Sequence, residues 1–172
     1  NQGEMYREEY DLNLEEACRQ LGVKKVPGGP EVRNTATFSR TGWMNIDRAV
    51  AISTANRETL DFTAANGKKA VIKYEELKVE VKDVSNYDRV NVYLLPDKLS
   101  SYQRITKREG EKFKENLNEL IQYDLLVVGF KGEDVSSKLE NSITPGELIV
   151  EMAPSSMERL NAIMSEEGKG SA

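Results

Sequence analysis

The heptapeptide ELKVEVK, residues 76–82, decides the fold class because apolar and charged residues alternate strictly along it. In an extended chain, successive side chains point to opposite faces, so one face carries the apolar set and the other the charges. The apolar set is Leu77, Val79 and Val81. One covered face and one wet face are typical of a strand in an antiparallel sheet. Residues 89–95, RVNVYLL, alternate in the same way and predict a second such strand.

Further strands are predicted on both sides of this centre. Residues 58–74, ETLDFTAANGKKAVIKY, indicate two short strands joined at Asn66-Gly67, because an Asn-Gly pair between β-forming runs is a strong hairpin signal. Residues 35–40, TATFSR, alternate and are rich in β-forming residues. Downstream, the apolar runs in 124–130 (DLLVVGF) and 147–152 (ELIVEM) predict two more strands, both of them buried.

Three segments have the period of a helix. Residues 12–21 predict a short helix with Asn13 as its N-cap and two glutamates in its first turn. Residues 111–123 place four apolar side chains on one helical face: Phe113, Leu117, Leu120 and Ile121. Residues 155–164 predict a closing helix with Ser155 as N-cap and an inward face of Met157, Leu160, Ile163 and Met164. The predicted fold is therefore α+β: a mostly antiparallel β-sheet or sandwich with two or three helices.

The chain of 172 residues has the length of one domain with a small appendage. Residues 24–32, KKVPGGPEV, form a break rich in proline and glycine, which is typical of a stiff loop between parts of a protein. We therefore predict an N-terminal helical appendage and linker over 1–30 and a β-rich main domain over 31–165. The remaining residues, 166–172, are predicted to be a frayed tail.

Two segments of the main domain resemble each other, residues 74–105 and 123–164. Each begins with a tyrosine followed by an acid and an alternating strand, and each reaches a proline after a second strand; the matched pairs are Tyr74 with Tyr123, Leu77 with Leu126, and Pro96 with Pro154. A duplicated strand–strand–proline unit would pack with its copy in one sheet or in two facing sheets. The alternative is a chance likeness of two β-rich segments.

Composition excludes several classes of function. The net charge is −5, from 29 acidic and 24 basic residues, and no basic block is present, so nucleic-acid binding is not expected. The chain has one cysteine and no histidine, which removes an intrachain disulfide, Ser-His and Cys-His pairs and most zinc sites. No segment approaches 18 consecutive apolar residues, so no membrane span is predicted. No cofactor is predicted either.

The stretch DVSNYDRVN, residues 83–91, gathers Asp83, Asn86 and Asp88 in what reads as a turn. Oxygen ligands at such spacing can hold calcium, but the glycine and terminal glutamate of an EF-hand loop are missing. Ordinary turn chemistry explains aspartate and asparagine at these positions. We therefore predict a turn and no metal ligand.

The stretch GWMNIDR, residues 42–48, is the candidate binding or structural signature, and it contains the only tryptophan. In an enzyme, Asp47 would act as acid or base, Arg48 as an anion clamp and Trp43 as a stacking platform. In a structural corner, Trp43 would close the edge of the core while Asn45 and Asp47 bond loop backbone. No second carboxylate or base is adjacent in the sequence, so we favour the structural role and predict no catalytic residue.

This stretch resembles a Gly-Trp-hydrophobic-Asn-x-Asp-Arg signature of uncharacterised secreted or lipid-anchored envelope proteins of Gram-negative gut anaerobes. The residues that carry the resemblance are Gly42, Trp43, Met44, Asn45, Asp47 and Arg48. The resemblance implies a periplasmic or cell-surface address, with a cytoplasmic one still open, and it implies no catalytic residue.

The expected function is that of a non-enzymatic cell-envelope binding or structural module whose partner is a protein or a glycan. One alternative is a carboxylate-dependent hydrolase that acts on glycans, which would need two carboxyl groups about 5–10 Å apart in a cleft. Another is an intracellular ligand-binding or regulatory domain. A deep cleft with Asp47 or Asp88 beside a second acid would favour the hydrolase.

Overall fold

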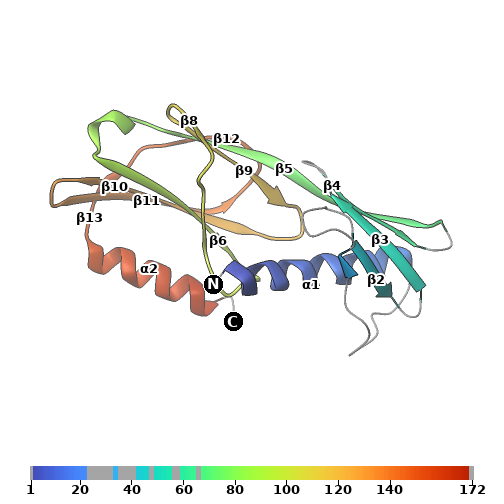
Figure 1. Ribbon diagram of the computed structural model, residues 1–172. Coiled ribbons are helices and arrows are strands. Elements are labelled where there is room, and N and C mark those ends of the chain that lie inside the picture. The colour runs from blue at the N-terminus through green and yellow to red at the C-terminus, as the bar shows by residue number, and fades with distance from the viewer. Residues whose placement is uncertain are drawn as a thin grey trace. The chain divides into compact units, whose positions relative to one another are not determined.

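The structure is a computed structural model, and it describes residues 2–22, 33–34, 42–46, 49–55, 59–64 and 67–170. It has the predicted α+β class: two helices and mostly antiparallel strands in two sheets (Figure 1). The helices are α1 (Gln2–Leu21) and α2 (Met157–Gly170). The strands are β1 (Arg33–Asn34), β2 (Gly42–Ile46), β3 (Ala49–Ala55), β4 (Thr59–Ala64), β5 (Lys69–Val81), β6 (Arg89–Pro96), β7 (Gln103–Arg104), β8 (Arg108–Glu109), β9 (Lys112–Asn118), β10 (Tyr123–Lys131), β11 (Asp134–Ile143), β12 (Gly146–Val150) and β13 (Ala153–Ser155), with a 3-10 turn at Val84–Asn86.

The chain groups into two compact units. The first, the α1 unit, comprises Tyr6–Tyr74 and Asn118–Leu120, and the second, the two-sheet unit, comprises Asn1–Met5, Glu75–Leu117 and Ile121–Ala172. Compact units defined by contacts need not coincide with domains defined by linkers, so the domain boundaries predicted from the sequence stay a prediction. The predicted strand over residues 35–40 lies outside the described residues.

The α1 unit is an antiparallel meander from β1 to the first half of β5. The predicted hairpin is confirmed: β4 pairs antiparallel with β5, and Thr63 lies opposite Lys69 in the register. Gly67, in the connection, has a φ of 88°, which glycine adopts without the steric cost of a Cβ.

Helix α1 supplies the other half of this unit's core. Its buried residues recur at i, i+3, i+4 and i+7 and pack with three buried residues of β4 and β5; the cluster is Leu14, Ala17, Cys18, Leu21, Phe62, Ala70 and Ile72. The helix begins at Gln2 rather than near Leu12, so the predicted N-cap role of Asn13 is wrong. Asn13 lies inside the helix, four residues before Ala17 on the buried face, and its amide bonds to other elements instead of capping.

Strand β5 buries even-numbered residues in its first half and odd-numbered residues in its second half. In the first half the buried residues are Ala70 and Ile72, whereas in the second half they are the predicted Leu77, Val79 and Val81. Glu75 and Glu76, both exposed, lie at the switch. Because successive side chains alternate between faces, this shift lets one continuous strand contribute to the cores of both units.

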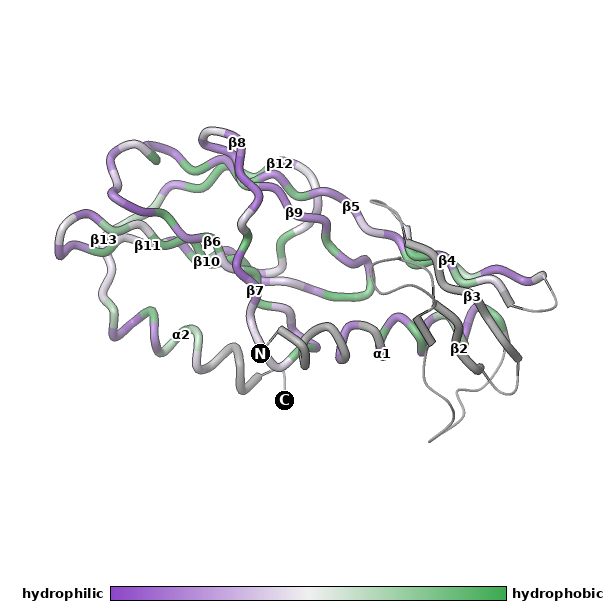
Figure 2. Tube along the Cα trace, in the orientation of Figure 1, coloured by the Kyte–Doolittle hydropathy of each residue, from purple (hydrophilic) through white to green (hydrophobic). Residues whose placement is uncertain are grey.

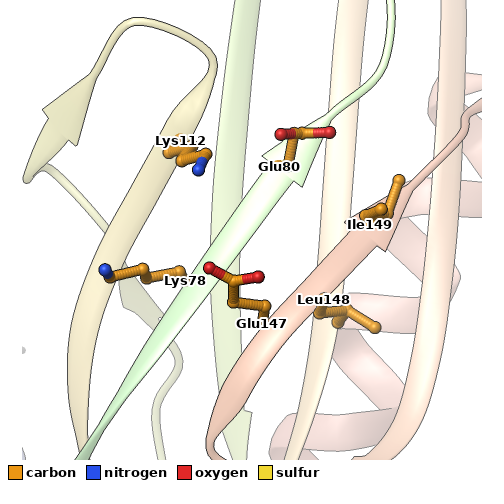
Figure 3. Close-up of a pocket in the computed structure, with 6 residues that line it drawn as sticks. All are labelled: Lys78, Glu80, Lys112, Glu147, Leu148 and Ile149. Atoms are coloured by element: carbon orange, nitrogen blue, oxygen red, sulfur yellow. The ribbon is translucent and has the colours of Figure 1, made fainter.

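The two-sheet unit has three layers: a sheet of β8, β9, β5 and β12, a second sheet in the order β13-β11-β10-β6-β7, and helix α2 (Figures 1 and 3). The predicted strand of residues 89–95 is β6, and its residues Val90, Val92 and Leu94 are buried as expected. Strand β12 pairs with β5 in parallel, in register from Gly146 with Leu77 to Val150 with Val81.

Strand β10 is covered on both faces. Leu125 and Val127 are buried on one face, and Leu126 and Val128 are buried on the other, where they pack with Leu160 of α2. A central strand between two layers needs apolar residues at every position, which explains the continuous hydrophobic stretch of β10 (Figure 2).

Helix α2 begins one residue later than predicted. The hydroxyl of Ser156, not Ser155, accepts a hydrogen bond from the backbone N–H of Arg159 at 3.1 Å and caps the helix. Leu160, Ile163 and Met164 pack against the sheet as expected. Met157 was predicted to face inward but is 49% exposed, because contacts with the sheet begin one turn later, at Leu160. The helix continues to Gly170, into the segment predicted to be a frayed tail.

The helix predicted over residues 111–123 is wrong, since this segment forms β9 and the turn that follows it. Phe113 and Leu117 are buried, as the pattern required. A spacing of four residues repeats on one face of a helix and also on one face of a strand, so these two residues cannot distinguish the two structures. Pairing with β5 in the sheet decides for the strand.

The two segments predicted to be a repeat place β5 and β10 in separate sheets. Their strand pairings differ, because β5 pairs with β12 in parallel whereas β10 pairs with β6 antiparallel. The predicted duplication stays a prediction. None of the described helices is long and apolar enough to cross a membrane.

Gly129 of β10 leaves no room for a side chain, and we expect Gly129→Ala to lower the free energy of unfolding by about 1–3 kcal/mol. An added Cβ would lie 2.6 Å from Cδ1 of Tyr87 and 2.8 Å from Cε of Met152. The methionine end can move, but the tyrosine ring is rigid. Urea unfolding followed by circular dichroism measures the effect. Ser136→Ala, opposite Gly129 in the register, is the control with a small expected change, and equal midpoints for the two variants would contradict the prediction.

Candidate functional site

The signature predicted from the sequence is described only in part. Trp43 and Asn45 lie in β2, where Trp43 is opposite Arg33 of β1 and Ile52 of β3. Their side chains, and the whole of Asp47 and Arg48, lie outside what the structure describes. The role of this signature therefore stays a prediction.

The outer face of the β9–β5–β12 sheet carries a shallow depression, which we call the β12 face (Figure 3). Three neighbouring strands supply its lining: Lys112 from β9, Lys78 and Glu80 from β5, and Glu147, Leu148 and Ile149 from β12. Glu147 is adjacent to Lys78 in the register, and Ile149 is adjacent to Glu80. The face therefore mixes both charge signs with one exposed aliphatic side chain.

Ile149 is the unusual member of this face because 58% of its surface is exposed. Large aliphatic residues on a wet sheet face lose the stabilisation that burial gives, about 1.5–3 kcal/mol for a complete side chain. Glu147 and Glu151 flank it in the sequence, and both are exposed. Single exposed apolar side chains are common on protein surfaces, so Ile149 indicates a binding site only together with the strand edge beside it.

Strand β12 forms one edge of this sheet. Its inner side pairs with β5, and among the described residues no strand pairs with its outer side. Exposed strand edges present unpaired N–H and C=O groups, and proteins usually cover them or break them up. An uncovered edge beside an exposed isoleucine makes β12 the best candidate for a binding site in the described part of the chain.

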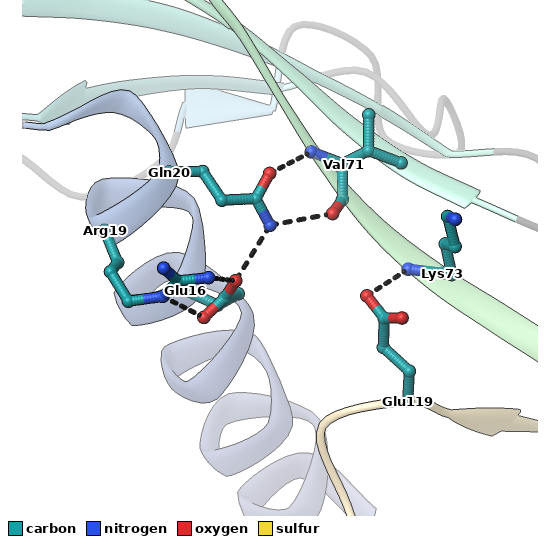
Figure 4. A network of polar contacts seen from close by, with 6 residues as sticks. All are labelled: Glu16, Arg19, Gln20, Val71, Lys73 and Glu119. Atoms are coloured by element: carbon teal, nitrogen blue, oxygen red, sulfur yellow. Dashed lines mark hydrogen bonds and ion pairs between the residues drawn. The ribbon is translucent and has the colours of Figure 1, made fainter.

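In the α1 unit, side chains form hydrogen bonds with the exposed edge of a strand, as Figure 4 shows. The Gln20 side chain accepts a hydrogen bond from the Val71 N–H at 2.9 Å and donates one to the Val71 carbonyl at 3.0 Å. Glu119 accepts a hydrogen bond from the Lys73 N–H through its carboxylate, at 3.2 Å. Side chains thus replace a neighbouring strand at this point of β5.

The same helix surface holds a local ion pair. Glu16 accepts hydrogen bonds from Arg19 at 2.8 Å and from Gln20 at 2.9 Å. These bonds, that from Arg19 above all, lower the pKa of Glu16 to about 2. The pair holds the Gln20 amide in place beside β5, which is a structural role.

A buried polar cluster lies in the core of the α1 unit. The Asn118 amide donates to Oδ1 of Asn13 at 2.8 Å, and the Tyr74 hydroxyl accepts from Asn13 at 3.2 Å and from Asn118 at 3.3 Å. Oδ1 of Asn118 accepts from the Leu120 N–H at 2.9 Å and fixes the turn after β9. Both asparagines are buried and have hydrogen-bond partners, so we assign this cluster a structural role: it joins α1 to β5 and β9.

Ionisation of Tyr74 should lower the free energy of unfolding between about pH 10 and pH 12. Burial, together with the nearby charge of Glu9, raises the pKa of Tyr74 from 10.0 to about 12. The folded state holds this proton more tightly than the unfolded state, so the contribution is complete below pH 10 and is lost as pH rises toward 12. Urea unfolding at pH 8 to 11.5 measures it against Tyr74→Phe, which cannot ionise. The stability advantage of the wild type over this variant should shrink with pH, and a constant difference would contradict the assignment.

The turn predicted at residues 83–91 is observed. The Asp88 carboxylate accepts a hydrogen bond from the Gly132 N–H at 2.8 Å, and Asp83 has a left-handed φ of 57°. Asp88 does not line the β12 face. No group of three or more metal-ligating side chains is found within the described ranges.

Comparison with known proteins gives no matching family model, no matching curated protein and no matching solved structure.

The strand predicted over residues 147–152 is β12, but it is not buried as expected, because Val150 is its only buried residue and Ile149 is 58% exposed. In the run ELIVEM, strict alternation places Ile149 on the same face as Glu147 and Glu151. An aliphatic residue on the charged face of a predicted strand was the available signal.

Proposed function

We propose that this protein is a non-enzymatic binding module of the cell envelope and that the β12 face is its binding surface. The envelope address is supported by the resemblance of residues 42–48 to the signature of envelope proteins described above. The binding role is supported by the β12 face, with its uncovered strand edge and mixed charges.

One observation carries the binding role: Ile149 is 58% exposed beside a strand edge that no described strand covers. Burying this side chain against a partner would recover hydrophobic free energy of about 1–2 kcal/mol. Charged neighbours on β5 and β12 keep the surface soluble when it is empty and give a partner its orientation.

The binding role is tested by probing arrays of peptides and glycans with the labelled whole chain and with its Ile149→Lys variant. Retention of one ligand class by the wild type and its loss in the variant is the expected result. Met157→Lys is the matched control, because Met157 is similarly exposed, at 49%, but lies on α2. Cleavage of an arrayed glycan, or retention that Ile149→Lys does not change, would overturn the proposal.

The address is tested separately by fractionating cells of the source organism and detecting the native protein with an antibody. Recovery with the envelope or periplasmic fraction is expected. Recovery in the cytoplasmic fraction alone would contradict the envelope part of the proposal and leave the binding part standing.

A further inference from the structure

We propose that the outer edge of β12 binds an extended peptide as an added strand, and that this peptide alternates basic and β-branched apolar residues on the face it shares with Glu147. The inference rests on the proposed binding role of the β12 face and specifies its partner class. Strand addition uses main-chain hydrogen bonds for affinity and alternate side chains for specificity.

The backbone of β12 is oriented for such an addition. The Lys82 N–H donates to the Val150 carbonyl at 2.9 Å, which shows that the polar groups of Val150 point toward β5. In a parallel pair the N–H and C=O of one residue point to the same side, and successive residues alternate sides. The N–H and C=O groups of Glu147 and Ile149 therefore point outward, giving two donors and two acceptors at the edge.

This edge differs from the edge of β5 in the α1 unit. There, the Gln20 amide and the Glu119 carboxylate satisfy the backbone of Val71 and Lys73. Along the outer side of β12, no comparable bond to Glu147 or Ile149 is seen within the described residues. Edges left uncovered are those at which another chain can pair.

The side chains define the chemistry of the partner. Glu147 and Ile149 alternate with Leu148 and the buried Val150, so they lie on the outer face, and the exposed Glu151 follows directly after the strand. Residues directly opposite each other on neighbouring strands interact, and opposite charges there are favourable. A basic residue, a β-branched apolar residue and a second basic residue, each two positions apart, would match this row.

The β12 strand of a second copy of the chain would be less complementary in charge to Glu147, Ile149 and Glu151. Antiparallel self-pairing centred on Ile149 would place Glu147 opposite Glu151 of the other copy, which is a repulsive contact. Self-pairing centred on Leu148 would place Glu147 opposite Ile149 and would bring no basic side chain to either carboxylate. Charge complementarity therefore favours a different, basic segment.

The test uses the whole chain and two synthetic peptides, acetyl-TKTVTKT-amide and its acidic counterpart acetyl-TETVTET-amide. Amide hydrogen exchange followed by NMR is the structural readout. The basic peptide should slow exchange of the Glu147 and Ile149 amides, while the Leu148 amide, already directed toward β5, should change little. Exchange slowed elsewhere and not at these two amides would overturn strand addition.

Charge reversal gives the second arm. Glu147→Lys should weaken binding of the basic peptide roughly tenfold, because one attractive cross-strand pair becomes repulsive, and it should strengthen binding of the acidic peptide. Glu147 is exposed, so the variant is expected to fold, and Met157→Lys should bind like the wild type. Equal binding of both peptides by the wild type, or no binding of either, would overturn the inference.

Two further outcomes separate this inference from the proposed function. Ile149-dependent retention of a glycan, without peptide binding, would overturn strand addition and leave the binding module standing. Concentration-dependent dimerisation that slows exchange of the Glu147 and Ile149 amides in the absence of peptide would identify a second copy as the occupant and would also overturn the inference.

Discussion

Phe62→Ala is expected to lower the free energy of unfolding by about 3–5 kcal/mol, the range for a large aromatic residue removed from a core. Phe62 is completely buried in β4 and belongs to the cluster that α1 and β5 complete. The variant loses the transfer free energy of the ring and leaves a cavity that rigid neighbours fill only in part. A loss of this size is a large share of the 5–15 kcal/mol that stabilises an ordinary domain.

Urea unfolding measures this effect with two probes. Trp43, the only tryptophan, belongs to the α1 unit and reports that unit by fluorescence, whereas far-ultraviolet circular dichroism reports both units. If the units unfold separately, Phe62→Ala should shift the fluorescence transition to lower urea and leave the later part of the dichroism transition in place. If they unfold together, both probes should shift equally.

Leu60→Ala is the matched control for Phe62→Ala. Leu60 lies on the same strand and touches the same cluster, but it is only partly buried. Its substitution should cost less than that of Phe62. A loss below about 1 kcal/mol for Phe62→Ala would contradict the packing of α1 on β4 and β5.

The sequence predicted strands correctly where one face of the strand is exposed to solvent or both of its faces are buried. Residues 76–82 and 89–95 alternate because β5 and β6 each bury one regular row, and the run of residues 124–130 is continuous because β10 lies between two layers. These patterns follow directly from burial, so composition along the segment suffices to read them.

Prediction failed where two structures share one pattern. Phe113 and Leu117 are four residues apart, a spacing that a helix and a strand both place on one face, and only pairing with β5 selects the strand. Asn13 has the side chain of an N-cap, but partners remote in the sequence, Tyr74 and Asn118, hold it inside α1. No local signal reveals such partners.

The candidate site was hidden for a related reason. Whether a strand lies at an edge depends on pairing across the whole sheet, and the parallel pairing of β12 with β5 joins segments far apart in the chain. The sequence could show that Ile149 shares a face with two glutamates, but not that no strand of the described residues pairs with the outer side of β12. The signature at residues 42–48 was selected because it contains the only tryptophan, and the rarity of a residue does not predict its exposure or its strand pairing.

Leu126→Ala is the second substitution with a large expected effect, a loss of about 2–5 kcal/mol in the free energy of unfolding. Leu126 lies on the face of β10 that α2 covers, with 1% of its surface exposed, and it packs with Leu95, Val128 and Leu160. Leu139→Ala, at a partly buried position in the same cluster, is the control and should cost less.

A double-mutant cycle with Leu160→Ala tests whether α2 is the layer that buries this face. If Leu126 and Leu160 pack against each other, each single substitution already removes part of their shared contact, so the double variant should lose less than the sum of the two. The expected coupling is about 0.5–3 kcal/mol, the range for residues in contact. Strictly additive losses would mean that Leu126 and Leu160 are buried independently, and the three-layer arrangement would then be wrong at α2. Coupling in that range would also explain why β10 needs leucine and valine on both of its faces: its second apolar row is buried only when the C-terminal helix is in place.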